Sequence, residues 1–457
     1  MKRRILNPTV NTGAVVLALT NLVCGQEKPA SPPVTAASAV QGTQPAPTAV
    51  APQPEPGTLD RFFNGKLPDA VGKSKISVNA RLRWEHADQD NRDSADAVTL
   101  RTRFGLTSGS LYGFQGMIEG ENIAVLGSRD AYDAVGSNPG GAGETVIADP
   151  PTTEINQAWV SYGNTNWHTV VKGGRQRLVL DNHRFVGDVG WRQNQQTFDA
   201  VTVENKSIPD LSVLYGWVGR VNRVFGNVSG LPAAFRDFES DSHVVNANYQ
   251  PTPYLKPTGY LYLLDLENAA SANNSCATYG LSLTGTAKVH EKVSLDYRAE
   301  FAWQTDYADS ALDYSAPYYN LELGATIKPF ALGVGYEILA SDNGTAFRTP
   351  LATLHAFNGW ADVFLNTPNA GLRDIYAFGQ ITLPAQVPLR VIYHKFDADT
   401  GGGDFGYEVD AVASKKFGKH WTVLAKYSYY DARDPSPPAQ AIPADVHKFW
   451  LQLEFVF

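Results

Sequence analysis

The chain ends at residues 449–457 with the stretch FWLQLEFVF. Its odd positions, from Phe449 to Phe457, are all large and apolar, whereas Gln452 and Glu454 are polar and lie between them. Successive side chains of a β-strand point to opposite faces of the sheet, so this alternation predicts a strand with one apolar and one wetter face.

This ending resembles the closing strand of bacterial outer-membrane β-barrels, whose terminal aromatic residue is read by the insertion machinery. The resemblance implies an antiparallel transmembrane barrel in the outer membrane of a Gram-negative-type bacterium. Its partners would be outer-membrane lipid and, through the terminal strand, the insertion machinery. We expect the terminal strand to close the barrel against residues 76–85, with its odd positions facing lipid and Gln452 and Glu454 facing the channel.

The start of the chain also indicates export. Residues 2–4 are basic, and residues 13–23 form an apolar run shorter than the about 20 residues of a membrane-spanning helix. This pattern predicts a signal peptide over 1–25, with a lipoprotein modified at Cys24 as the alternative. Residues 26–75 predict a Pro/Ala-rich periplasmic linker and N-terminal extension. Cleavage after residue 25 leaves Cys276 alone, so no intrachain disulfide is expected.

Composition bounds the rest of the chain. The net charge of -8 argues against a general nucleic-acid-binding protein. The mean hydropathy of -0.24 alone would suit a soluble protein, but a barrel conceals its apolar residues by alternation. By length, the roughly 400 residues after the linker could form two or three soluble domains or one large barrel. Aromatic residues make up 11% of the chain, which fits the girdles that barrels place at both membrane interfaces.

Periodicity favours the barrel. Alternation over residues 76–457 predicts about eighteen strands, joined by short turns and longer loops in a rhythm typical of outer-membrane barrels. The strands are predicted near 76–85, 99–106, 114–122, 154–162, 167–175, 196–205, 211–221, 243–250, 257–265, 277–286, 293–304, 320–328, 332–338, 374–383, 388–396, 407–416, 421–429 and 449–457.

Charged side chains indicate which face of the sheet meets lipid. Arg or Lys near the membrane midplane costs about 2–4 kcal/mol on the lipid face. The basic residues that alternate with the apolar set are therefore expected to point into the lumen: Arg81, Arg83, Arg101, Arg103, Arg298 and Lys426. A barrel of this size encloses more space than side chains fill, so we expect an aqueous channel.

The central part of the chain carries a family resemblance. EINQAWV at 154–160 is followed by GRQ at 174–176, RFVG at 184–187, Trp191 and TFDAV at 197–201. Later come HAFNGWAD at 355–362 and GLRD at 371–374. In this order the motifs resemble the alginate export family of outer-membrane barrels, over roughly residues 76–457.

The resemblance implies an eighteen-stranded barrel and a function in transport. The namesake of the family passes a polyuronate outward through an arginine-lined pore and closes it with a long periplasmic turn near the C-terminus. The turn here, at 417–420, is short. Arginine suits such a pore because its planar fork pairs bidentately with carboxylates. The candidates for guiding the solute are Arg81, Arg83, Arg101, Arg103, Arg175, Arg184, Arg192 and Arg298.

Two groups of candidate residues have alternative interpretations. Glu119 and Glu121 on the third predicted strand lie near the arginines of the first two strands, which then form either an anion-guiding ladder or a set of compensating charge pairs. The loop that holds Arg184 and Trp191 either constricts the channel, offers Trp191 as a sugar-stacking platform, or forms an anchoring network.

No motif predicts catalysis, a metal centre or a cofactor. The His residues lack metal-ligand spacing and no GxSxG nucleophile motif occurs. Asp397, Asp399 and Asp404 either bind Ca²⁺ or form a hydrated loop tip. We therefore expect a channel that passes small hydrophilic, anionic solutes such as sugars or uronates by passive diffusion. The alternatives are export of an acidic polysaccharide, an adhesin or scaffold acting through extracellular loops, and an outer-membrane hydrolase.

Overall fold

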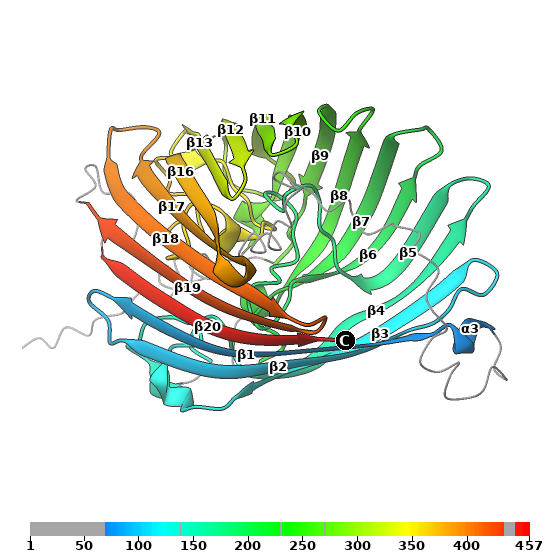
Figure 1. The fold of residues 1–457 in the computed structure, drawn as a ribbon, viewed down its shortest axis with the longest axis horizontal. Helices are drawn as coiled ribbons and strands as arrows, with labels where there is room; N and C mark the ends of the chain where they lie inside the picture. The colour runs from blue at the N-terminus through cyan, green and yellow to red at the C-terminus, as the bar shows by residue number, and fades with distance from the viewer. Residues whose placement is uncertain (1–68, 138, 229–230, 232, 269–270, 434–443) are drawn as a thin grey trace, which may run out of the picture.

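The computed structural model describes residues 69–137, 139–228, 231, 233–268, 271–433 and 444–457. Within them, eighteen strands form one closed antiparallel barrel (Figure 1). The predicted signal peptide and most of the predicted linker lie outside the described residues. A short helix, α3 (Asp69–Gly72), precedes the first strand.

The barrel strands follow one another in chain order. They are β1 (Lys75–Gln89), β2 (Ala95–Thr107), β3 (Phe114–Val125), β4 (Thr152–Asn164), β5 (Thr169–Gln176), β6 (Thr197–Asn205), β7 (Leu211–Asn222), β8 (Asp237–Tyr249), β9 (Lys256–Leu264), β10 (Cys276–His290), β11 (Val293–Asp306), β12 (Ser315–Ile327), β13 (Phe330–Leu339), β16 (Leu372–Leu383), β17 (Val387–Asp397), β18 (Asp404–Phe417), β19 (Trp421–Ala432) and β20 (Val446–Val456). Each predicted strand overlaps one of them, so the predicted fold class is confirmed.

The C-terminal strand closes the barrel. β20 pairs with β19 on one side and with β1 on the other, in a register from Asn79 opposite Val456 to Gln89 opposite Val446. The backbone continues this pairing at the last residue, because the Phe457 amide donates to the Val78 carbonyl at 2.8 Å. The sheet that the described residues form therefore has no edge strand, which is the condition for a sheet to span lipid.

Side chains alternate between lipid and lumen as the sequence predicts. On β1, Leu82 and Trp84 are each 39% exposed, whereas Arg83 between them is 0% exposed. On β12, Leu321 and Leu323 are exposed and Asn320 is buried. No helix in the described part of the chain is long and apolar enough to cross a membrane.

The two ends of the barrel differ. Short turns such as 165–168, 328–329 and 418–420 lie at the end where β1 begins and β20 finishes. This is the periplasmic end in barrels of this kind, and the longer loops are extracellular. The alternation of short periplasmic turns and long extracellular loops is not strict, however, because the β1–β2 connection at 90–94 is also short.

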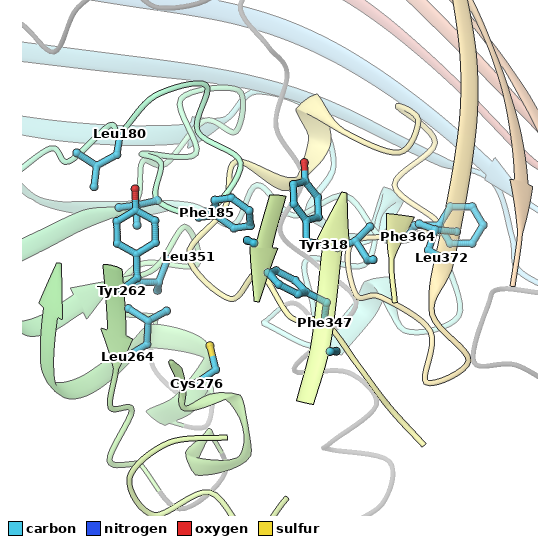
Figure 2. Packing of buried hydrophobic residues seen from close by; sticks show 14 of the residues in the cluster. Leu180, Phe185, Tyr262, Leu264, Cys276, Tyr318, Phe347, Leu351, Phe364 and Leu372 are labelled. Atoms are coloured by element: carbon cyan, nitrogen blue, oxygen red, sulfur yellow. The ribbon is translucent and has the colours of Figure 1, made fainter. Parts of the chain in front are cut away.

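The hydrophobic core lies inside the barrel. The β5–β6 loop (177–196) and the β13–β16 loop (340–371), which carries the small hairpin of β14 (Ser341–Asp342) and β15 (Thr345–Ala346), both contribute buried residues to it. In Figure 2, Phe185 of the first loop and Phe347 of the second lie beside Tyr318 of the wall. The Phe185 ring centroid is 5.2 Å from that of Tyr318 and 5.8 Å from that of Phe347. Burial of these apolar side chains holds both loops within the lumen.

Candidate functional site: the lumen wall and its inward loops

The arginines of β1 and β2 hold the β5–β6 loop against the wall. Arg81 Nη1 donates to the carbonyl oxygens of Gly190 at 3.0 Å and Trp191 at 2.9 Å. Arg83 Nη2 donates to the same Trp191 carbonyl at 2.6 Å. These bonds fix the loop backbone to the lumen face of the first strand.

Each of these wall arginines also has a carboxylate partner. Glu454 lies 3.4 Å from Arg81 and 3.1 Å from Arg101, and Glu121 pairs with Arg103. Arg83 lies 3.6 Å from Asp149 of the β3–β4 loop (126–151) and 4.0 Å from Glu85. The geometry at these strands is that of compensating charge pairs rather than of free cations.

Glu119 is satisfied by amides. Its Oε1 accepts from Asn156 at 2.7 Å and from Gln157 at 3.0 Å. Both donors belong to the EINQAWV motif on β4, so this motif joins adjacent strands on the lumen side.

Arg192 links three parts of the molecule. Its side chain is 2% exposed and lies 3.1 Å from Glu85 on β1 and 2.9 Å from Asp362 in the β13–β16 loop. Asp362 also accepts from Lys448 of β20 at 2.8 Å. Arg192 therefore joins both inward loops to the wall through buried ion pairs.

Trp191 is part of the same anchor. It is 5% exposed, stacks on His355 with ring centroids 5.0 Å apart, and has the Arg83 guanidinium 3.9 Å from its ring. A ring covered in this way does not offer a platform for sugars. Of the three roles that the sequence left open for this loop, which are constriction, sugar stacking and anchoring, these contacts of Trp191 favour anchoring.

His355 bridges Asp362 and the wall. Burial, together with the charges of Lys426 and Arg192, lowers the pKa of His355 well below its usual range, against the opposing effect of Asp362. The imidazole is therefore neutral at physiological pH. Its partners assign the tautomer: Nδ1 donates to Asp362 at 2.5 Å and Nε2 accepts from Lys426 at 2.5 Å.

Arg184 ties the two inward loops together at a second point. Its side chain, 2% exposed, donates to both carboxylate oxygens of Glu337 on β13, at 2.8 and 3.1 Å, and to Asn358 at 3.1 Å. Like Arg192, it forms a buried contact that positions the loops.

Two other predicted residues lie elsewhere. Arg298 on β11 faces the lumen and pairs with Glu300 at 2.8 Å. Arg175 does not line the lumen, which corrects the prediction. It lies opposite Ala158, which shares its face with the exposed Val160, and it pairs with Asp199 at 2.8 Å.

The loop tip with three aspartates contains ion pairs. Asp397 and Asp404 contact Lys395, and Asp399 contacts Arg373. In the described residues, no group of three or more His, Cys, Asp or Glu side chains could hold a metal ion.

Asp188 gives the β5–β6 loop a dependence on pH. Its Oδ2 accepts from Arg177 Nε at 2.8 Å and from Gln195 at 2.7 Å, so it joins both ends of the loop. Burial acts to raise the pKa of Asp188, but Arg177 and His183 outweigh it and lower the pKa from 3.8 to about 2. Because the folded pKa is depressed, this stabilisation is present above pH 3.8 and is lost as the pH falls toward about 2.

We therefore expect the single-channel conductance to stay constant from pH 7 to 4 and to rise or become noisy between about pH 4 and 2. Asp188→Asn should lack this transition and should show the less ordered loop at every pH. An acid transition of equal size in both proteins would contradict the assignment to Asp188.

Sequence reasoning missed Arg390 on β17 and the role of the Lys426–His355 contact. Arg390 lies in the predicted strand at 388–396, with no motif around it. The Lys426–His355 contact joins residues 71 positions apart, a separation that leaves no local pattern.

A closed barrel, an apolar outer belt and a charged lumen with inward loops define a β-barrel channel of the Gram-negative outer membrane. The family model described as "Alginate export" matches residues 129–401, more than half of the chain, and the chain belongs to this family. No curated protein matches the chain in sequence.

Solved outer-membrane channels share the fold. OccAB2 of Acinetobacter baumannii aligns with a TM-score of 0.66 and 15% identity, covering 86% of this chain and 99% of that one. OpdQ of Pseudomonas aeruginosa aligns with a TM-score of 0.64 and 17% identity, over 84% and 98%. OpdK of the same organism, solved with vanillate, aligns with a TM-score of 0.62 and 13% identity, again over 84% and 98%.

Proposed function

We propose that the protein is a passive channel for small hydrophilic solutes, with a preference for anionic ones such as sugar acids. The observation that carries this proposal is the fixation of two loops inside the lumen by Arg184 and Arg192. Buried ion pairs keep such loops in place, so they narrow the channel permanently and set a size limit. The proposal involves no turnover chemistry, and diffusion is driven by the solute gradient alone.

The solved OpdK supports the choice of solute, because it was determined with vanillate, a small carboxylate. The chain shares the fold of OpdK at low identity, so the ligand itself is not carried over.

Liposome swelling tests the size limit. Vesicles containing the purified protein should swell quickly in glucose or sodium glucuronate and not in a hexasaccharide of the same osmolarity. Equal swelling in all three solutes would contradict the size limit, and no swelling above that of protein-free vesicles would contradict a channel.

Export of an acidic polysaccharide is the second candidate, and membership of the alginate export family favours it. The turn between β18 and β19, at 418–420, is too short to form a periplasmic plug of the kind implied by the family resemblance. If the chain exports a polymer, deletion of its gene should abolish secretion of that polymer while leaving glucuronate uptake unchanged.

We further propose that residues 1–25 are removed as a signal peptide and that residues 26–75 form a periplasmic extension. N-terminal sequencing of the protein from outer membranes should begin at Gln26. A lipid-modified Cys24 at the N-terminus would contradict this cleavage.

A further inference from the structure

Arg390 differs from the other arginines that face the lumen from the strands. On β17 the next residue, Val391, is 42% exposed on the lipid face, so Arg390 points toward the lumen. Arg390 pairs with Gln380 of β16 and with Val412 of β18. Arg81, Arg83, Arg101, Arg103 and Arg298 each have a carboxylate within 4.0 Å, as given above. Among the described residues, no carboxylate lies within that distance of Arg390, and its Nε is buried without a partner.

An aromatic ring takes the place of the carboxylate. The Arg390 guanidinium carbon lies 4.0 Å from the ring centroid of Phe378 on the neighbouring strand β16. Stacking of a guanidinium on a ring fixes its plane and leaves the edge of its donor fork free. The Arg390 side chain is neither buried, as those of Arg83 and Arg192 are, nor fully exposed.

Two glycines of β13 make room for this arrangement. A Cβ at Gly333 would lie 2.4 Å from the Phe378 ring, and one at Gly335 would lie 2.1 Å from the ring of Tyr376. Both aromatic rings of β16 therefore lie flat across the backbone of β13.

The acid that acts on Arg390 already has a hydrogen-bond partner. Glu322 on β12 acts on Arg390 electrostatically, but its Oε2 accepts from the Tyr376 hydroxyl at 2.7 Å. Tyr376 thus holds the carboxylate beside the site without closing an ion pair on Arg390.

We infer that Arg390 is the residue that selects anions in this channel, and that its free fork binds the carboxylate of a passing small organic acid. The inference rests on the proposed passive channel and names the chemistry that its selectivity requires. A single guanidinium binds one carboxylate bidentately and releases it, because in the water-filled lumen the interaction is screened. Solutes that carry one carboxylate group are the class that fits.

The test compares four forms of the full-length protein in planar bilayers: wild type, Arg390→Gln, Arg390→Lys and Lys416→Gln. Lys416 lies on the inner side of β18, four residues from Val412, which pairs with Arg390, or about 13 Å along the strand. Its removal controls for the loss of one positive charge. Two quantities are measured: the reversal potential in a KCl gradient, and the reduction of the KCl current by sodium glucuronate, with glucose as the neutral comparison.

Wild type should prefer chloride and lose current to glucuronate but not to glucose. Arg390→Gln should lose the chloride preference and require about tenfold more glucuronate for the same reduction. Arg390→Lys should keep the chloride preference but respond weakly to glucuronate, because an ammonium lacks the planar fork. Lys416→Gln should behave like wild type.

Failure of the proposed channel and failure of the inference about Arg390 give different results. Wild type without current steps would overturn the proposed channel and this inference with it. A conducting wild type whose glucuronate response is unchanged in Arg390→Gln would overturn the inference alone. The mobility of each variant in gels, with and without heating, shows whether it is folded. If Arg390→Gln fails to fold, the glucuronate response of Arg390→Lys tests the inference instead, and a response equal to that of wild type would overturn it.

Discussion

Replacing Arg192 with alanine should raise the single-channel conductance severalfold. Arg192 is the charge that holds Glu85 on the wall and Asp362 in the β13–β16 loop, and all three side chains are buried. Its loss leaves two buried carboxylates without this partner, and breaking a buried pair in this way costs about 3–5 kcal/mol. We expect this loss to loosen the part of the β5–β6 loop around Arg192 and to widen the lumen there.

The control is Arg373→Ala. Arg373 also pairs with an aspartate, Asp399, but its side chain is 40% exposed, and such pairs contribute at most about 1 kcal/mol. We expect its conductance to equal that of wild type. If Arg192→Ala also conducts like wild type while folding normally, the ion pairs do not set the width of the channel.

The second large effect concerns the outer face of the barrel. Leu323 on β12 is 64% exposed on the face assigned to lipid, so Leu323→Arg should lower the free energy of unfolding in lipid bilayers by about 2–4 kcal/mol. Gln157→Arg is the matched change on the inner wall. Gln157 already donates to Glu119 at 3.0 Å, so an arginine there gains a carboxylate partner and should be tolerated.

Urea titrations of the two variants in phospholipid vesicles measure these changes. Destabilisation by Gln157→Arg with tolerance of Leu323→Arg would invert the assignment of faces. Destabilisation by both to the same extent would mean that position 157 is not open to the lumen.

The fold could be predicted from the sequence because each strand carries its own signal. A period of two over ten residues separates lipid from lumen, and the charge cost of the lipid face decides which set is which. The pairing of β1 with β20 followed from the terminal stretch in the same way, although the paired residues lie 357 to 377 positions apart, from Gln89 with Val446 to Asn79 with Val456.

Arg175 shows where alternation fails. The register of β3 and β4 shifts between Glu119 and Gly120. As a result Ile155 and Val160 both face outward, although they are five positions apart and strict alternation would put them on opposite faces. A bulge of this kind reverses the faces beyond it. A pattern of alternating residues does not reveal such a bulge. Arg175 pairs with Ala158, which lies beyond the bulge on β4, and Arg175 therefore lies on the outer face.

The contacts of the inward loops could not be predicted either. Arg192 and Asp362 are 170 residues apart, and Arg184 and Glu337 are 153 apart. Such pairs follow from the closed barrel, which brings the loops together, and no local periodicity encodes them. The sequence did indicate a loop rich in charged and aromatic residues at 176–195, but not that its arginines would be buried and paired.

Single-channel recording of the purified full-length protein in planar bilayers tests the central claim most directly. We expect discrete current steps of uniform size in KCl and a reversal potential that shows a preference for chloride over potassium. Absence of steps, or a preference for potassium, would contradict it.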